Sequence, residues 1–198
     1  FVVKKNKNLF MVEHSGSNQS EFSIGRMKGF HGQFGVFVRA LSYIMSLGAD
    51  GLSQVSGDAV LNANYLRVRL SKYLTPFHNG TCMHEVLFDG SFLDGTGTRT
   101  IDFAKAMIDS GFHPPTMYFP LVVEGALLFE PTETESKQSL DELIDAVIKL
   151  AKKAMKKETP EFFENSPMNA PRLRLDETLA ARKPILRWTP NPLLKAAE

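Results

Sequence analysis

The stretch GFHPPTMYFP, residues 111–120, lies where a predicted helix gives way to a predicted strand. Pro114 and Pro115 hold the backbone in extended or turn conformations and remove two amide donors, so His113 lies on a stiff loop. The apolar run at 117–123 that follows predicts a strand. Loops at strand ends often carry the chemistry of α/β proteins, so His113 is a candidate functional residue. The alternative is a turn histidine that caps the end of a helix.

The segments around this loop predict a small α+β layer. Hydrophobic periodicity and bounding glycines indicate a strand at 83–89, a helix at 101–110, strands at 117–123 and 126–129 joined in a hairpin across Glu124 and Gly125, and a helix at 139–157. Ser136 and Ser139 are candidates to cap the last helix. Strands and helices that follow one another in this order are typical of an α+β domain.

The residues before this layer predict two strands, a loop and two helices. Residues 1–12 read as strands around a Lys/Asn turn, and residues 13–31 are rich in Ser and Gly, which favours a loop. A helix at 32–47, ended by Gly48, is apolar around most of its circumference, so we expect it to be buried. A second helix at 50–71 carries Asn62 and Asn64, which are mildly unfavourable there. Either they bond to a neighbouring loop, or they are tolerated on the surface.

Composition restricts the class of protein. The chain has 198 residues, 43% of them hydrophobic, and a net charge of +1, which argues against general affinity for nucleic acid or membranes. Cys82 is the single cysteine, so an internal disulfide is impossible and a reducing cytoplasmic setting is expected. The apolar runs are too short to span a bilayer. The chain opens with FVVKK, without methionine or a signal pattern, so we expect it to be the C-terminal piece of a longer protein.

No familiar catalytic motif is present in the sequence. GTGT at 95–98 lacks the spacing of a nucleotide-binding loop, no serine has a nucleophile elbow, and the five histidines lack metal-ligand spacing, so no metal site is expected. What remains are polar residues at strand and helix ends. His84 and Glu85 open a strand, and FEPTETE at 129–135 closes the hairpin with carboxylates that either cap the next helix or orient a facing side chain. GFHGQFG at 29–35 enters a helix with small residues, so its amides are able to face an anion.

Several longer stretches together resemble one family. GFHPPTMYFPL, EPTETE, AVLNANYL, MHEVLFD and RLDETLAARKPILRW are similar to the glycine-cleavage-system P-protein family, the pyridoxal-phosphate-dependent glycine dehydrogenase (decarboxylating). The resemblance runs from about residue 23 to residue 188. The tail is similar to the two-subunit form, in which the C-terminal half, subunit 2, is a separate polypeptide.

This resemblance implies a fold and a division into domains. The fold would be that of a fold-type-I, aspartate-aminotransferase-like enzyme, whose large domain holds pyridoxal 5'-phosphate and whose smaller C-terminal α+β domain closes over the substrate. Residues 1–72 would form the end of the large domain and the connecting helices, residues 73–158 the small domain, and residues 159–198 a proline-rich tail that wraps a surface or stays partly disordered.

The resemblance also implies a reaction and its partners. The complete enzyme would decarboxylate glycine and pass the aminomethyl group to the lipoyl arm of the H-protein, together with the N-terminal subunit, subunit 1. The family's Schiff-base lysine lies in a His-Lys segment that this sequence lacks, so the chain alone is expected to be inactive. The competing hypothesis is a stand-alone, non-catalytic α+β domain that binds a ligand or a partner.

Roles for particular residues follow from the same resemblance. His113 would be catalytic, with Thr116 and Glu130 fixing its orientation in the cleft between the domains. The backbone amides of His31 and Gly32 would bind the cofactor phosphate. The residues expected to bind the substrate are Arg26, Thr116, Glu130 and Thr132, with Arg26 as a carboxylate or phosphate clamp.

Overall fold

The structure, a computed structural model, describes residues 2–4, 10–12, 32–156 and 160–187. The chain divides into two compact units, Phe1–Asp50 and Gly51–Glu198. Arg26 and His31, two of the predicted binding residues, lie outside the described residues.

The first unit contains a hairpin and a helical segment. Strands β1 (Val2–Lys4) and β2 (Phe10–Val12) pair antiparallel, as the sequence predicts. Helix α1 (Phe34–Leu70) is interrupted at Gly48, whose φ of 65° is not helical. Gly48 therefore ends the first helical segment, as expected of a left-handed glycine, and the second segment resumes directly after it.

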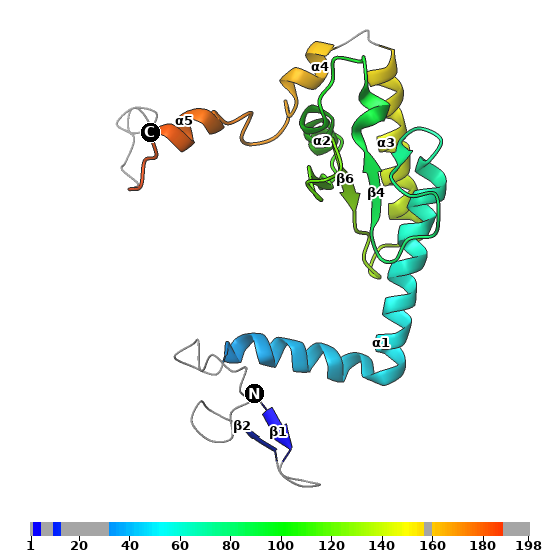
Figure 1. Cartoon of the computed structure of the whole chain (residues 1–198), viewed down its shortest axis with the longest axis vertical. Helices are drawn as coiled ribbons and strands as arrows, with labels where there is room; N and C mark the ends of the chain where they lie inside the picture. Colours follow the sequence, from blue (N-terminus) through cyan, green and yellow to red (C-terminus); the bar gives the residue numbers. More distant parts are fainter. Residues whose placement is uncertain (1, 5–9, 13–31, 157–159, 188–198) are drawn as a thin grey trace. The chain divides into compact units, whose positions relative to one another are not determined.

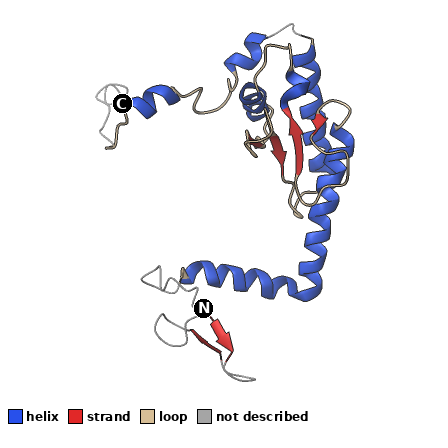
Figure 2. Ribbon diagram, viewed as in Figure 1, coloured by secondary structure: helices blue, strands red, loops and turns tan. Residues whose placement is uncertain are grey.

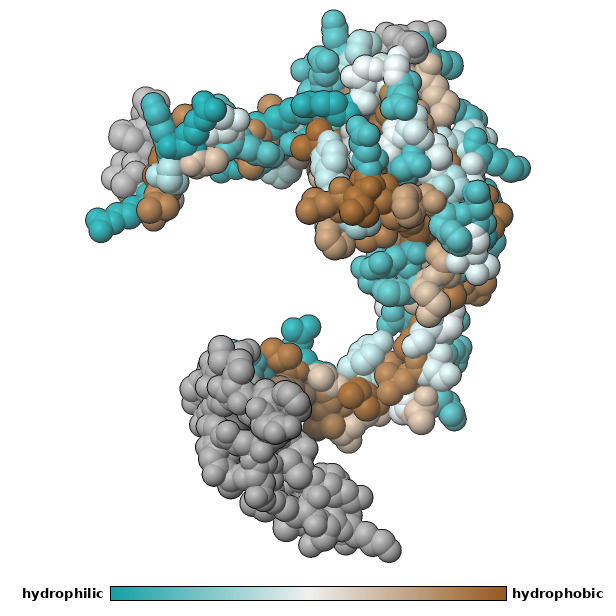
Figure 3. Space-filling view, in the orientation of Figure 1, coloured by the Kyte–Doolittle hydropathy of each residue, from teal (hydrophilic) through white to brown (hydrophobic). Residues whose placement is uncertain are grey.

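The expectation that the helix at 32–47 is buried is wrong for this chain. Its apolar side chains are exposed, with Phe34 at 79%, Met45 at 73% and Leu41 at 57% of their full accessible area. Figure 3 shows hydrophobic surface, coloured brown, along the first segment of α1. Apolar residues all round a helix indicate that a surface must cover it, but the described chain does not provide that surface.

The second unit is built on a four-stranded antiparallel sheet (Figures 1 and 2). Its order is β3-β4-β6-β5, in which Val86 lies opposite Phe129 and Thr116 opposite Leu128. The strands are β3 (Thr75–Pro76), β4 (Val86–Asp89), β5 (Thr116–Met117) and β6 (Leu127–Phe129). The helices around it are the 3-10 turn η1 (Gly90–Leu93), α2 (Thr100–Asp109) and α3 (Lys137–Met155). The predicted α+β layer is confirmed.

One hydrophobic core holds this unit together. Alternate residues of β4 and β6 are buried, and Phe88 and Phe129 meet edge to face with ring centroids 5.9 Å apart. The second segment of α1 adds Leu66 and Leu70 to the same cluster, together with the buried faces of α2 and α3. Ser136 caps α3 by accepting the amide of Ser139, as predicted.

The predicted strand at 117–123 is mostly a loop. β5 ends at Met117, Tyr118 has a left-handed φ of 55°, and the peptide bond between Phe119 and Pro120 is cis. The chain then turns, with the amide of Val123 donating to the carbonyl of Pro120. Pro120 has no amide for a ladder, so the apolar run cannot continue as a paired strand. β5 and β6 still form a hairpin, but residues 118–126 connect them.

The described part of the tail, residues 160–187, packs partly on the second unit. Helix α4 (Pro160–Asn165) places Phe163 in the core, and Asp109 at the end of α2 accepts the amides of Met168 and Asn169, each at 2.8 Å. Helix α5 (Glu177–Arg182) has no buried residue. Among the described helices, none is both long and apolar enough to pass through a bilayer.

Candidate functional site

The sheet of the second unit carries polar residues at both ends of its strands, in the loops that flank β4, β5 and β6. Because β4 and β6 are antiparallel, the end of β4 lies beside the start of β6. We call this side, with residues 89–94 and 118–125, the pocket edge. The residues that precede β4 and β5 and follow β6, namely His84, Glu85, His113, Glu130 and Thr132, lie at the other side, which we call the histidine edge.

The pocket edge surrounds a cavity of about 730 Å³. Such a cavity, lined by both apolar and convergent polar groups, is the usual form of a small-molecule site. Its lining consists of Phe77, Asp89, Gly90, Ser91, Leu93, Asp94, Thr98, Arg99, Thr100, Tyr118, Val122, Val123, Glu124 and Gly125.

Two glycines allow the backbones of β4 and β6 to meet beneath this cavity. The amide of Gly90 donates to the carbonyl of Glu124 at 2.9 Å, and a Cβ on Gly90 would lie 2.8 Å from the Cα of Gly125. Gly125 itself has a φ of 61°, and its carbonyl accepts the hydroxyl of Thr100 at 3.1 Å. Any larger residue at either glycine would push the two strand ends apart, so the shape of the cavity depends on both.

Tyr118 brings a phenol to the start of α2. Its hydroxyl oxygen accepts the amide of Ile101 at 3.2 Å, which satisfies one of the free amides in the first turn of that helix. In the described part of the chain this hydroxyl has no acceptor of its own, so its proton is available to a ligand. The left-handed backbone at Tyr118 is the conformation that directs the ring there.

Arg99 is the cation of the cavity lining, and Asp102 fixes it in place. The Nε and Nη2 atoms of Arg99 donate to Asp102 at 2.8 and 3.0 Å. These hydrogen bonds raise the pKa of Arg99. Burial alone would raise the pKa of Asp102, but the hydrogen bonds from Arg99 and Arg174 bring it below its ordinary value. Both groups are therefore charged at neutral pH, and the arginine keeps Nη1 for another partner.

The charges of the lining suit a small molecule that carries both signs. Three carboxylates, those of Asp89, Asp94 and Glu124, attract an ammonium group, while Arg99 and Tyr118 offer donors to an anionic group. The lining contains no lysine, so these residues provide no amine for a Schiff base.

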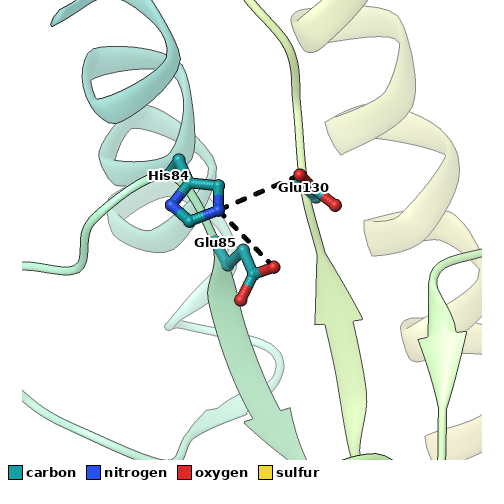
Figure 4. A group of neighbouring side chains, drawn as sticks. All are labelled: His84, Glu85 and Glu130. Carbon is teal, nitrogen blue, oxygen red and sulfur yellow. Dashed lines mark ion pairs between the residues drawn. The ribbon is translucent and has the colours of Figure 1, made fainter. Parts of the chain in front are cut away.

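The histidine edge is an exposed cluster of ion pairs (Figure 4). The Nε2 atom of His84 lies 3.7 Å from Glu85 Oε1 and 3.9 Å from Glu130 Oε1. One ligand atom from each of the three lies within 4.8 Å of the others, so they are a group able to hold a divalent metal ion. All three side chains are more than a third exposed to solvent.

Asn62 and Asn64 tie α1 to the loops at this edge. Asn62 donates to the carbonyl of Thr132 at 2.9 Å. Asn64 donates to the carbonyl of Cys82 at 2.7 Å and accepts its amide at 3.0 Å. Of the two alternatives for these asparagines, the structure shows the bonds to neighbouring loops.

His113 is exposed, and its orientation differs from the prediction. Its Nδ1 donates to the carbonyl of Pro114 at 2.9 Å, and in the described chain neither Thr116 nor Glu130 orients the ring. Thr116 lies in β5, and the hydroxyl of Thr132 pairs with that of Thr134 at 2.7 Å. None of these predicted residues lines the cavity.

Gly32, predicted to bind a phosphate, lies in the first unit just before α1. Its φ is 132°, and a Cβ there would come within 2.3 Å of the ring of Phe37. The positive φ strains any residue other than glycine at this position.

The sequence reasoning missed the pocket edge. Its residues come from segments 77–100 and 118–125, which meet only in the folded unit. The available signal was the pair of glycines that follow Asp89 and Glu124 at predicted strand ends, together with a tyrosine just ahead of Pro120.

The fold and the cavity define an α/β domain with a small antiparallel sheet and a cavity with polar lining residues at one end of its central strands. The family model described as glycine dehydrogenase, C-terminal domain, matches residues 55–172. The chain belongs to this family.

Two relatives and one solved structure give the extent of the similarity. The probable glycine dehydrogenase (decarboxylating) subunit 2 of Caulobacter vibrioides is 59% identical over 91% of this chain and 34% of its own length. The protein of the same name from Kosmotoga olearia is 53% identical over 85% of this chain and 35% of its own length. The chain thus spans about a third of these relatives. A crystal structure of glycine decarboxylase (P-protein) of the glycine cleavage system, in inhibitor-bound form, matches 55% of this chain and 24% of that chain, with 23% identity and a TM-score of 0.48.

Proposed function

We propose that the complete protein is a glycine dehydrogenase (decarboxylating) of the glycine cleavage system, which decarboxylates glycine and passes the aminomethyl group to the lipoyl arm of the H-protein. The observation that supports this most strongly is the family match over residues 55–172, a range that contains every residue of the cavity lining. Relatives that align with 91% and 85% of the chain carry this enzyme's name. A stand-alone, non-catalytic domain is therefore the less favoured alternative.

The role proposed for the second unit is to form one wall of the cleft that binds glycine. Glycine is a zwitterion at neutral pH, and the lining offers carboxylates to its ammonium group and the donors of Arg99 and Tyr118 to its carboxylate. A wall of this kind orients the substrate and keeps water from the reacting carbon.

Pyridoxal 5'-phosphate is the cofactor that the family implies, and the lining does not fit its covalent attachment because it lacks a lysine. When bound, this cofactor acts as an electron sink for the carbanion left by the loss of carbon dioxide. We propose that its lysine and most of its binding residues belong to the part of the complete protein that this chain does not span. The backbone around His31 and Gly32 remains a proposed contact for the phosphate.

We further propose the partners and the setting that the resemblance implies. These are the N-terminal subunit, the lipoylated H-protein and a cytoplasmic environment. They rest on the family match, and the single cysteine at position 82 suits a reducing compartment.

The test compares the two edges of the sheet in the complete enzyme. If the pocket edge faces glycine, Arg99→Ala raises the KM for glycine roughly tenfold or more in the glycine–bicarbonate exchange assay, because a hydrogen bond to a charged group is lost. The cofactor absorbance stays unchanged, and His113→Ala behaves like the wild type.

The opposite result would move the site. If His113→Ala abolishes exchange with normal cofactor absorbance while Arg99→Ala does not change KM, the histidine edge faces the substrate, as the resemblance implies. Thr116→Ala and Glu130→Gln are further substitutions at the histidine edge. Wild-type rates of glycine–bicarbonate exchange in these two variants, in Arg99→Ala and in His113→Ala would contradict a role for either edge.

A further inference from the structure

We infer that Arg174, in the C-terminal tail, is a positioning residue that holds Arg99 in the glycine pocket through the buried carboxylate of Asp102; this inference rests on the proposed function of that pocket. Neither the family name nor the sequence assigns a role to the tail. The contacts among the side chains of Arg99, Asp102 and Arg174 support such a role.

The tail is fixed along α2 at both ends of that helix. At the C-terminal end, both carboxylate oxygens of Asp109 accept the amide of Met168. At the N-terminal end, Arg174 Nη1 donates to Asp102 Oδ1 at 2.7 Å. The segment between them therefore runs the length of α2 and ends beside the pocket edge.

The carboxylate of Asp102 is saturated by its two arginine partners. Oδ2 accepts the backbone amide and the Nε of Arg99, at 3.2 and 2.8 Å. Oδ1 accepts Nη2 of Arg99 at 3.0 Å and Nη1 of Arg174 at 2.7 Å. The side chain of Asp102 is only 1% exposed, so water cannot replace a lost partner without a rearrangement.

Arg174 is itself held rigidly. Its Nε donates to the carbonyl of Ser166 and its Nη2 to the carbonyl of Phe163, each at 2.7 Å. Phe163 lies in the core and stacks on Phe103 of α2 with ring centroids 6.4 Å apart. The planar guanidinium of Arg174 makes three hydrogen bonds that hold its positive charge beside Asp102. A lysine ammonium on its flexible chain would hold the charge there less firmly.

The consequence concerns Arg99, whose side chain is 68% exposed and would otherwise move freely. Asp102 keeps the guanidinium of Arg99 in one orientation, in which Nη1 remains available to a ligand. It does so only while the carboxylate of Asp102 is itself held in place. Arg99 lies in the same turn as Asp102, as the N-cap of α2. Among the described residues, the side-chain donor that reaches Asp102 from outside this turn is Arg174, and it is anchored to the core. Loss of Arg174 would therefore loosen the donor that meets the substrate, although Arg174 itself does not line the pocket.

The first test follows Arg99 directly in this chain by NMR. We expect the Nε–Hε proton of Arg99, which donates to Asp102 at 2.8 Å, to exchange with water more slowly than that of an unbonded arginine in the wild type. We expect Arg174→Ala to speed this exchange several-fold and to shift its resonance, and Arg174→Lys to fall between the two. Arg172→Ala is the matched control, because Arg172 is an exposed arginine two positions away that makes no hydrogen bond in the described chain. An Arg99 signal that Arg174→Ala leaves unmoved overturns the inference.

The second test measures KM and kcat for glycine in the complete enzyme. Arg174→Ala should raise KM several-fold with little change in kcat, and the double variant Arg99→Ala/Arg174→Ala should have the KM of Arg99→Ala alone, because both changes remove one interaction. A higher KM in Arg99→Ala with a normal KM in Arg174→Ala would overturn the inference and leave the pocket in place. A normal KM in Arg99→Ala would instead contradict the proposed site.

Discussion

At the scale of single residues, Asp102 is a buried carboxylate that joins Arg99 of the cavity lining to Arg174 of the tail. It lies in the first turn of α2, where a carboxylate is favoured by the helix dipole. In a sequence it looks like an ordinary surface residue of that kind. Its burial, and its partner 72 positions further along the chain, come only from the way the tail returns to α2.

Replacing this carboxylate is expected to destabilise the unit in a pH-dependent way. Asp102→Asn should lower the free energy of unfolding by about 2–3 kcal/mol at neutral pH, since the amide leaves Arg174 without its charged partner. The pKa of Asp102 lies below its ordinary value of 3.8 in the folded chain, so its stabilisation is present above that pH and is lost as the pH falls through the lower, folded pKa.

Urea unfolding at neutral pH and at about pH 3 measures this difference. The difference in the free energy of unfolding between the wild type and Asp102→Asn should be smaller at the lower pH. Asp145→Asn, at an exposed carboxylate of α3, is the control and should match the wild type at both values. A gap that does not change with pH would mean that the charge of Asp102 does not stabilise the fold.

At the scale of elements, α1 is held to the sheet by asparagines rather than by apolar contacts alone. Their unfavourable position in a helix indicated that they bond elsewhere, and the bonds to Thr132 and Cys82 show where. For the apolar run at 117–123, in contrast, the structure differs from the prediction. Its composition favours a strand, but Tyr118 and Pro120 turn the chain, and this turn forms the rim of the pocket.

Asn64→Ala is expected to open the loop that carries Cys82. Two hydrogen bonds to the backbone of Cys82 disappear, which should lower the free energy of unfolding by about 2 kcal/mol. Burial raises the pKa of the Cys82 thiol, although Arg67 and a backbone hydrogen bond lower it, so the wild-type thiol should react slowly. The rate of modification by a disulfide reagent at pH 8 should rise in Asn64→Ala.

Asn62→Ala provides the comparison for this rate. Asn62 makes its one bond to a different loop, so its loss should leave the reactivity of Cys82 near that of the wild type. If the modification of Cys82 is accelerated equally in Asn62→Ala and Asn64→Ala, the cause is a general loosening of α1 and not the loss of the hydrogen bonds from Asn64 to Cys82.

At the scale of the whole molecule, the second unit and the first segment of α1 differ in how much apolar surface their described residues bury. The second unit has a continuous core, whereas the first segment of α1 exposes its large apolar side chains. The family match begins at residue 55, so it covers the unit with the core and not this segment. Contiguous apolar surface of this kind promotes association in water.

We therefore expect this chain, when purified alone, to self-associate in a concentration-dependent way. Leu41→Lys should reduce the association measured by sedimentation velocity, because it places a charge on the exposed apolar face. Ser46→Lys, which adds the same charge at a polar position of the same helix, should have a smaller effect. A wild-type chain that sediments as a monomer at all concentrations would refute this expectation.

The sequence by itself determined helices α1, α2 and α3, strands β4 and β6 and the family resemblance, because periodicity, capping and short motifs are local properties of the chain. Only the tertiary structure decided which edge of the sheet holds a pocket and which side chains are fixed there. Arg99, Asp102 and Arg174 meet because α2 and the tail pack on the same core, and no local pattern specifies a contact between residues so far apart.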